Sequence, residues 1–151
     1  MYTLLVLSDS HGYEGTLSNV LMKATSLGKY DAVLLLGDGY YDLEPYEKLL
    51  PPIYQVGGNC DYGRGETSLF FRYFGVPIFM AHGHTFHVKQ TLTMYQSTAR
   101  SLKARIALYG HTHIQHLEEN NDLMLLNPGA VMDGRFALLH IDGSNVKATL
   151  Y

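Results

Sequence analysis

Residues 2–7, Tyr2-Thr3-Leu4-Leu5-Val6-Leu7, form a nearly continuous apolar run that leads directly into Ser8-Asp9-Ser10-His11. Such a run is typical of a β-strand that is covered on both faces. Residues 14–27 then show apolar side chains at helical spacing. A second apolar run, over residues 32–36, ends at Gly37-Asp38-Gly39. This alternation of strand and helix predicts a parallel sheet with helices packed on it.

The second half of the chain shows a different pattern. Residues 68–74 and 76–81 are strand-like and are separated only by Gly75, which predicts a hairpin. Apolar residues at helical spacing predict a long helix over 88–102, namely Val88, Leu92, Tyr95, Ala99 and Leu102. The remaining predicted elements are a short helix at 42–50 and strands at 53–56, 105–109, 115–119, 123–126, 135–141 and 145–150. We therefore predict a mixed α/β sandwich of two packed sheets with helices outside, formed by one domain over residues 1–151.

The composition fits this expectation. Hydrophobic residues make up 46% and charged residues 17% of the chain, which is the balance of an ordinary folded protein. The net charge of −3 offers no broad positive surface, so strong nucleic-acid binding is not expected. No apolar run approaches the roughly 20 residues that a membrane span needs, and Cys60 is the only cysteine. We expect a cytoplasmic protein without a signal peptide, membrane segment or disulfide framework.

Each cluster of unusual polar residues follows the carboxyl end of a predicted strand. Ligands of open α/β sheets bind in the crevice beyond these strand ends. Five strand ends are therefore expected to bring carboxylate, amide and imidazole groups toward one rim. The candidate metal ligands are Asp9, His11, Asp38, Asn59, His82, His111 and His113.

The residue types suit a pair of divalent cations. Aspartate and neutral histidine are ordinary ligands for mid-sized divalent metals. In residues 9–11 and 111–113, alternation along an extended segment places two ligands on the same side. Hydrolytic two-metal sites hold their ions roughly 3.5–4 Å apart, and an aspartate with two oxygens can bridge them. Asp38, which lies between two glycines, is the candidate for this bridge.

Several short motifs occur in a characteristic order. They are Asp9-Ser10-His11, Gly37-Asp38, Gly58-Asn59-Cys60-Asp61, His82-Gly83-His84 and Gly110-His111-Thr112-His113. This series resembles the calcineurin-like metallophosphoesterase superfamily, and within it the small YfcE-like phosphodiesterases. The resemblance covers nearly the whole chain, as far as Asn127-Pro128-Gly129.

The resemblance implies an αββα four-layer sandwich and a divalent-metal-dependent enzyme that hydrolyses small phosphodiesters. It also implies two metal sites with one shared ligand. The first site would consist of Asp9, His11, Asp38 and His113, and the second of Asp38, Asn59, His82 and His111. Manganese is the expected metal, with zinc, iron or nickel as alternatives.

Two positions depart from the pattern of the wider superfamily. In the wider superfamily, a histidine that is proposed to protonate the leaving group often follows the metal-binding asparagine. In this chain Cys60 occupies that position, as a cysteine does in the YfcE-like branch. Without that acid, substrates with good leaving groups should be favoured. Ala130 stands where the family commonly has a serine after Asn-Pro-Gly. This difference affects a minor polar contact and not the metal ligands.

The resulting mechanistic hypothesis is attack on phosphorus by a hydroxide that bridges two metals, because bound metals lower the pKa of water to about 7. The Asn59 amide would help to neutralise the phosphoryl oxygens. His84, two residues after His82, is either a substrate-contacting residue and candidate proton donor or a structural histidine. Arg64 and Arg135 are candidate phosphate contacts that their spacing does not single out.

Other residues have plainer interpretations. His87, His116 and His140 are read as ordinary histidines, and Cys60 as a packing residue rather than a nucleophile. Asp61 is expected to orient its loop. The twelve tyrosines serve either as packing residues or as a surface for a partner or a substrate base.

The main alternative function is a non-catalytic interaction scaffold, because the same fold occurs in a retromer subunit that binds partners through its surface. All seven ligand positions here are chemically competent, which favours the enzyme. A metal-dependent nuclease is a third candidate, and the negative net charge argues against it. Hydrophobic strand edges and the many tyrosines are also compatible with a homo-oligomer.

Overall fold

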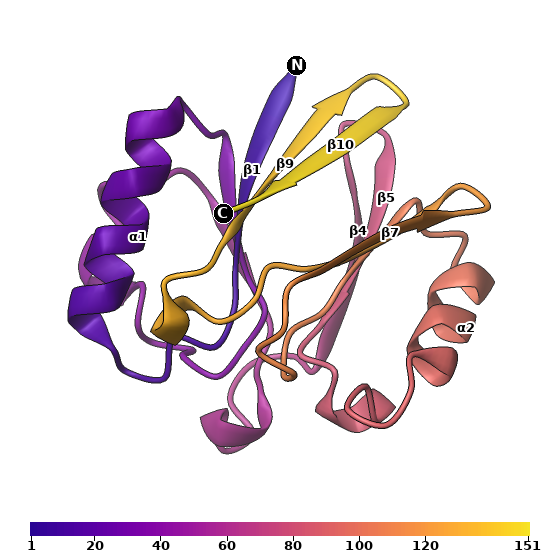
Figure 1. The fold of residues 1–151 in the computed structure, drawn as a ribbon, viewed down its shortest axis with the longest axis horizontal. Coiled ribbons are helices and arrows are strands. Elements are labelled where there is room, and N and C mark those ends of the chain that lie inside the picture. Colours follow the sequence, from indigo (N-terminus) through magenta and orange to yellow (C-terminus); the bar gives the residue numbers. More distant parts are fainter.

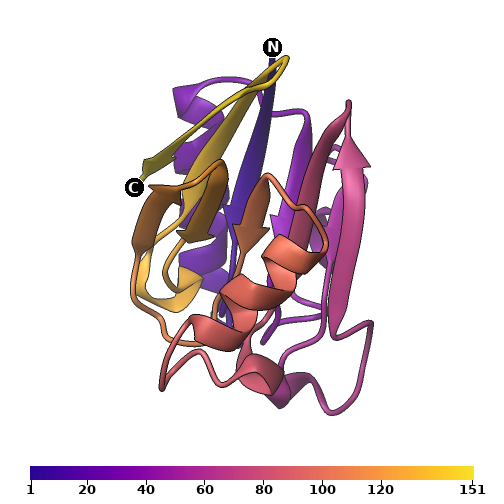
Figure 2. The same ribbon diagram turned by 90° about the vertical axis from the view of Figure 1, so that its right-hand side faces the viewer.

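The computed structural model describes residues 1–151 and contains two five-stranded mixed sheets that pack face to face (Figure 1). Helix α1 (Glu14–Leu27) covers the outer face of the first sheet, and α2 (Thr93–Ser101) covers that of the second. Figure 2 shows α2 lying across the strands that it covers. The predicted αββα four-layer sandwich is therefore confirmed.

The first sheet has the strand order β10-β9-β1-β2-β3. Its strands are β1 (Tyr2–Leu7), β2 (Ala32–Leu35), β3 (Ile53–Gln55), β9 (Ala137–Asp142) and β10 (Asn145–Leu150). Strands β1, β2 and β3 run parallel, with Leu5 opposite Val33 and Val33 opposite Ile53. The segments that follow these three strands consequently emerge at the same end of the sheet.

The second sheet has the strand order β4-β5-β6-β8-β7. Its strands are β4 (Ser68–Tyr73), β5 (Val76–Ala81), β6 (Ile106–Leu108), β7 (His116–Asn120) and β8 (Leu123–Asn127). The three central strands are parallel, with Ile78 opposite Ile106 and Ile106 opposite Met124. The edge strands β4 and β7 are antiparallel to their neighbours, so the predicted hairpin of β4 and β5 is confirmed.

Strand β1 shows why its sequence is apolar at almost every position. Leu4 and Val6 belong to the core between the two sheets, whereas Leu5 and Leu7 pack on the other face in the cluster that includes α1. All four side chains are fully buried. Burial of each leucine stabilises the fold by roughly 1.5–3 kcal/mol, so the strand that precedes Asp9 is a firm support for it.

The helix predicted over 42–50 is wrong. The structure has a 3₁₀ turn, η1 (Glu44–Tyr46), followed by turns. Pro45 is tolerated only near the start of a helix, and Pro51 prevents continuation. Leu43, Tyr46 and Leu50 still pack against the core of the first sheet, but turns rather than a full helix bring them there, and Leu49 is 83% exposed.

The long helix predicted over 88–102 is shorter in the structure, where α2 begins only at Thr93. Residues before it form a 3₁₀ turn, η3 (His84–Phe86), and further turns. His87, just before the predicted range, has a left-handed φ of 54°, so η3 does not continue into a right-handed helix, and residues 87–90 form turns. Val88 is buried all the same, because the turn rather than a helix carries it to the core. No helix in the structure is both long and apolar enough to span a membrane.

Candidate metal centre

Loops from both sheets meet at one end of the sandwich, which is the lower end in Figure 1. Asp9 follows β1 and Asp38 follows β2, while His82 directly follows β5 and His111 follows β6. Asp9 and His82 are fully buried, and Asp38 is 3% exposed. The parallel pairings of β1 with β2 and of β5 with β6 thus deliver four polar side chains to the same place.

A first cluster joins Asp9, His11 and His113. The Asp9 Oδ1 atom lies 3.1 Å from His113 Nε2 and 3.4 Å from His11 Nε2. The other carboxylate oxygen, Oδ2, accepts hydrogen bonds from the Ser8 hydroxyl and from the amide N–H of His111. Asp9 is therefore fixed through one oxygen, while the other faces two imidazoles.

A second cluster joins Asp38, His82 and His111. The His82 Nε2 atom lies 3.1 Å from Asp38 Oδ2 and 3.2 Å from His111 Nδ1. On its other side, His82 Nδ1 donates to the carbonyl oxygen of Leu36 at 2.8 Å. A carbonyl can only accept, so a neutral His82 presents a lone pair at Nε2. Three electron-pair donors then converge, as they would around a cation.

The two clusters adjoin one another. His11 Nε2 lies 3.5 Å from Asp38 Oδ2, and His82 Nε2 lies 3.9 Å from Asp9 Oδ1. His11 Nε2 is buried and has no hydrogen-bond partner. A buried nitrogen between two carboxylates is costly unless a proton or a metal ion satisfies it. The mixture of carboxylate oxygens and imidazole nitrogens fits mid-sized divalent metals.

The backbone at these positions is unusual. Five of the seven predicted ligands adopt a left-handed φ between 47° and 67°, namely Asp9, His11, Asp38, His111 and His113. Such values are uncommon for residues other than glycine and cost of order 1 kcal/mol or more each. Neighbouring interactions must hold them in place, and a concentration of this kind marks a functional site.

Asp61 is one of these supports. Its carboxylate accepts four backbone N–H hydrogen bonds, from Asp38, Gly39, Tyr40 and Gly58, at 2.7–3.0 Å. It thereby ties the loop after β2 to the loop after β3. At Gly58 a Cβ atom would lie 2.2 Å from Asp38 Oδ1, so only glycine permits this close approach.

Asn127, at the end of β8, supports the loop that carries His111 and His113. Its amide nitrogen donates to the Gly110 carbonyl and to the Thr112 hydroxyl, at 3.1 and 2.9 Å. Asp42 supports the loop after β1 in the same way, because its carboxylate accepts hydrogen bonds from the Ser10 hydroxyl and the Gly12 N–H. Nothing in the local sequence marked Asp42, because its partners lie about thirty positions away.

The charges of the second cluster are arranged for metal binding. Burial opposes ionisation of Asp38, but His82, the Cys60 N–H and His11 together hold the pKa of Asp38 well below its usual value. Burial also opposes a charge on His82, yet Asp38 and Asp9 raise its pKa overall. Burial and the neighbouring His82 lower the pKa of His111 to about 4. At neutral pH, Asp38 is a carboxylate and His111 is neutral, as metal ligands must be.

Asn59 is placed differently from the other predicted ligands. It begins the 3₁₀ turn η2 (Asn59–Asp61), and its side chain is exposed. Its amide nitrogen lies 3.5 Å from Cys60 Sγ and makes no hydrogen bond with another predicted ligand. The turn nevertheless adjoins the site, because the Cys60 N–H donates to Asp38 Oδ1 at 2.8 Å.

Of the other residues considered in the sequence, His84, Cys60 and Arg64 lie near the two clusters and Arg135 does not. His84 lies near the site, with its ring centre 5.5 Å from that of His82 and a buried Nδ1 without a partner. Cys60 is exposed rather than packed, which corrects the expectation of a packing residue. Arg64 shares a cavity with His11 and Asp38. Arg135 instead lies against Gly129, on a loop that belongs to neither cluster.

The αββα sandwich and the aspartate–histidine clusters at its strand ends together define a metal-binding hydrolase. The sequence profile described as "Calcineurin-like phosphoesterase superfamily domain" matches residues 2–143. The chain belongs to this superfamily, and it is accordingly a phosphoesterase of a family that uses divalent metal ions.

Individual relatives agree with this assignment. The probable metallophosphoesterase YsnB of Bacillus subtilis is 32% identical over 129 residues, which cover 85% of this chain and 74% of that protein. Phosphodiesterase YfcE of Escherichia coli is 25% identical over 157 residues, covering 87% of this chain and 80% of that protein. A crystal structure of a predicted phosphoesterase from Streptococcus pneumoniae is 29% identical, with a TM-score of 0.81, and covers 99% of this chain and 88% of that one.

The same fold also occurs in Vps29 proteins. Vps29 of Entamoeba histolytica, solved in complex with zinc, has a TM-score of 0.74 at 19% identity, covering 99% of this chain and 98% of that one. Identity this low establishes a common fold and no more.

Proposed function

We propose that this protein is a divalent-metal-dependent phosphodiesterase that acts on small phosphodiesters. The observation that carries the proposal is the pair of adjoining clusters, with Asp38 between His11 of one and His82 of the other. Two carboxylates and four imidazoles gathered within these clusters have no structural purpose that apolar residues would not serve better. Catalysis at a metal centre is the role that accounts for them.

The proposed ligands of the first metal are Asp9, His11, Asp38 and His113. Those of the second are Asp38, Asn59, His82 and His111, with Asp38 shared between the two. Manganese is proposed first, with zinc, iron or nickel as alternatives. Bound divalent ions would supply positive charge for the phosphoryl oxygens and would acidify a water molecule.

The chain itself would position the ester and accept or withhold protons. Arg64 lines the same cavity as His11 and Asp38, and its guanidinium is stacked 5.3 Å from the centre of the Tyr41 ring, so it can contact a phosphoryl oxygen. Burial and His82 lower the pKa of His84, which keeps it neutral at pH 7. Burial and the Asp38 charge raise the pKa of the Cys60 thiol. Neither residue is then a strong acid for the departing alcohol, so esters of acidic alcohols should react best.

Hydrolysis of bis(p-nitrophenyl) phosphate tests the proposal. We expect manganese-loaded protein to release p-nitrophenolate, and we expect chelation followed by dialysis to stop the reaction until metal is restored. Elemental analysis should find two metal ions per chain. Protein that holds metal but hydrolyses no phosphodiester would contradict the proposal and would favour the non-catalytic scaffold function.

Metal affinity should increase with pH. In the metal-free protein, Asp38 and Asp9 raise the pKa of His82, so the metal must displace a proton from its imidazole below that pKa. The affinity should therefore rise with pH and level off once His82 is neutral. His111, with its pKa lowered to about 4, contributes no proton near neutral pH. Calorimetric titration in two buffers of different ionisation enthalpy should detect proton release on metal binding that diminishes as the pH rises. An affinity that does not change with pH would contradict this assignment.

A further inference from the structure

A second cavity, of about 300 Å³, lies beside the cavity that contains His11 and Asp38. Tyr40 and Tyr41 line both of them, so the neighbouring pocket adjoins the metal cluster through these two residues. The connection is direct along the chain, because Tyr40 comes two residues after Asp38, and its N–H donates to the Asp61 carboxylate that also holds Asp38. We call it the tyrosine pocket.

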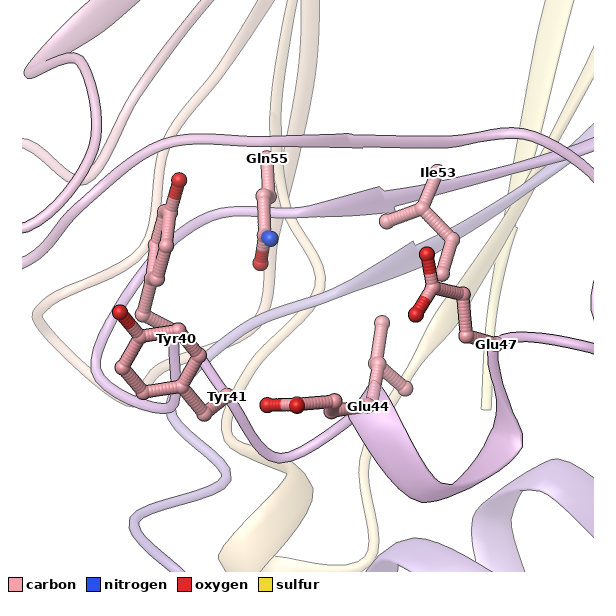
Figure 3. Close-up of a pocket in the computed structure, with 7 residues that line it drawn as sticks. Tyr40, Tyr41, Glu44, Glu47, Ile53 and Gln55 are labelled. Atoms are coloured by element: carbon pink, nitrogen blue, oxygen red, sulfur yellow. The ribbon is translucent and has the colours of Figure 1, made fainter.

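The polar groups of the tyrosine pocket are electron-rich. Figure 3 shows Glu44 and Glu47 reaching into it from one side and Gln55 from the opposite strand, with the rings of Tyr40 and Tyr41 at one end. Neither glutamate has a salt-bridge partner, and the Gln55 Oε1 atom is buried without a hydrogen-bond donor. Leu43 and Ile53 complete the lining. No cationic side chain lines this pocket.

This chemistry selects a cation. Two carboxylates would repel a phosphate group, whereas aromatic faces and carboxylates together attract alkylammonium groups. The volume lies at the lower limit for small-molecule pockets, so it suits a head group rather than a whole nucleotide. Arg64, which lies over the Tyr41 ring, offers a positive charge in the cavity that contains His11 and Asp38. The two cavities are thus complementary to a molecule with an anionic and a cationic end.

From this arrangement we infer that the preferred substrates are zwitterionic phosphodiesters, in which one esterified alcohol carries an ammonium group that occupies the tyrosine pocket. The inference rests on the proposed phosphodiesterase function and specifies its substrate class. The phosphate would lie at the metal cluster beside Arg64. The ammonium group would lie between the tyrosine rings and the carboxylates of Glu44 and Glu47.

Two esters that differ only in charge test the substrate class. They are p-nitrophenyl phosphorylcholine and 3,3-dimethylbutyl p-nitrophenyl phosphate, in which carbon replaces the quaternary nitrogen. In both, water adds to phosphorus and p-nitrophenolate leaves, so the leaving group is constant. We expect kcat/KM to be about fivefold higher for the choline ester. In the double variant Glu44→Gln/Glu47→Gln the ratio should fall toward one, whereas Glu118→Gln, which removes a charge from the exposed face of β7, should leave it unchanged. A ratio of one in the wild-type protein would overturn the inference.

Binding can be measured without hydrolysis. In NMR titrations with choline chloride, we expect the amide signals of Tyr41, Glu44 and Glu47 to shift, and 3,3-dimethylbutan-1-ol at matched ionic strength to leave them in place. The double variant should lose the response to choline. Absence of selective shifts would overturn the tyrosine pocket as a cation site even if both esters are hydrolysed. Selective shifts in a protein that hydrolyses neither ester would instead overturn the proposed phosphodiesterase function and leave the cation site standing.

Discussion

Replacement of Asp38 by asparagine is expected to lower kcat/KM for bis(p-nitrophenyl) phosphate by about a thousandfold or more. Asp38 Oδ2 lies between His11 Nε2 and His82 Nε2, at 3.5 and 3.1 Å, so it is the carboxylate oxygen common to both clusters. An amide at this position has no negative charge and offers one oxygen instead of two. The variant should therefore bind less metal as well as react more slowly.

Asparagine is preferable to alanine at this position because Asp38 Oδ1 also accepts the N–H of Cys60. The remaining amide oxygen can keep that hydrogen bond, so the loop should stay folded. Elemental analysis and initial rates should be measured together, and circular dichroism should confirm an intact fold. Asp142→Asn, at the exposed end of β9 beside Ile141, which pairs with Tyr2 at the opposite end of β1 from Asp9, is the matched control and should keep full activity. Substantial hydrolysis by Asp38→Asn or by His111→Ala would contradict the proposed metal centre.

Sequence patterns predicted the sheets better than the short helices. The apolar run of β1 needs no information from elsewhere, because a strand buried on both faces must be apolar throughout. The segment 42–50 differs, since a few apolar residues there are equally compatible with a helix and with turns. In the folded chain, turns bring Leu43, Tyr46 and Leu50 to the core and leave Leu49 exposed. Likewise, the spacing of Val88 and Leu92 suggested helix, but residues 87–90 form turns, and the helix begins only at Thr93.

The candidate ligands could be listed from the sequence because aspartate and histidine stand out after apolar strands. Their supports could not be identified in the same way. Asp42 looks like an ordinary surface acid until its distance to the Ser10 hydroxyl is known. Arg64 and Arg135 were equivalent in the sequence, and only the loop after β3 brings Arg64 into the cavity with His11. Long-range contacts of this kind depend on how the two sheets are positioned, which local patterns do not encode.

Asp61 should prove as important for stability as Asp38 is for chemistry. Its two carboxylate oxygens accept four backbone N–H groups, one pair at Gly39 and Tyr40 and the other at Asp38 and Gly58. Asp61 itself is 6% exposed, so water can replace few of these bonds. Because each buried donor left without an acceptor costs about 1–3 kcal/mol, Asp61→Ala should lower the free energy of unfolding by about 4 kcal/mol or more.

Urea denaturation of the metal-free protein measures this loss directly, with Asp133→Ala as the exposed control. Asp61→Asn should also destabilise, because its NH₂ group would face two N–H donors in place of an acceptor oxygen. Neither variant removes a proposed metal ligand. Both should nevertheless weaken metal binding, because Asp38 has a left-handed backbone, with φ 58°, and its N–H would lose the Asp61 acceptor that helps to hold it. An unfolding free energy within about 1 kcal/mol of wild type for Asp61→Ala would show that the loops after β2 and β3 hold each other without this carboxylate.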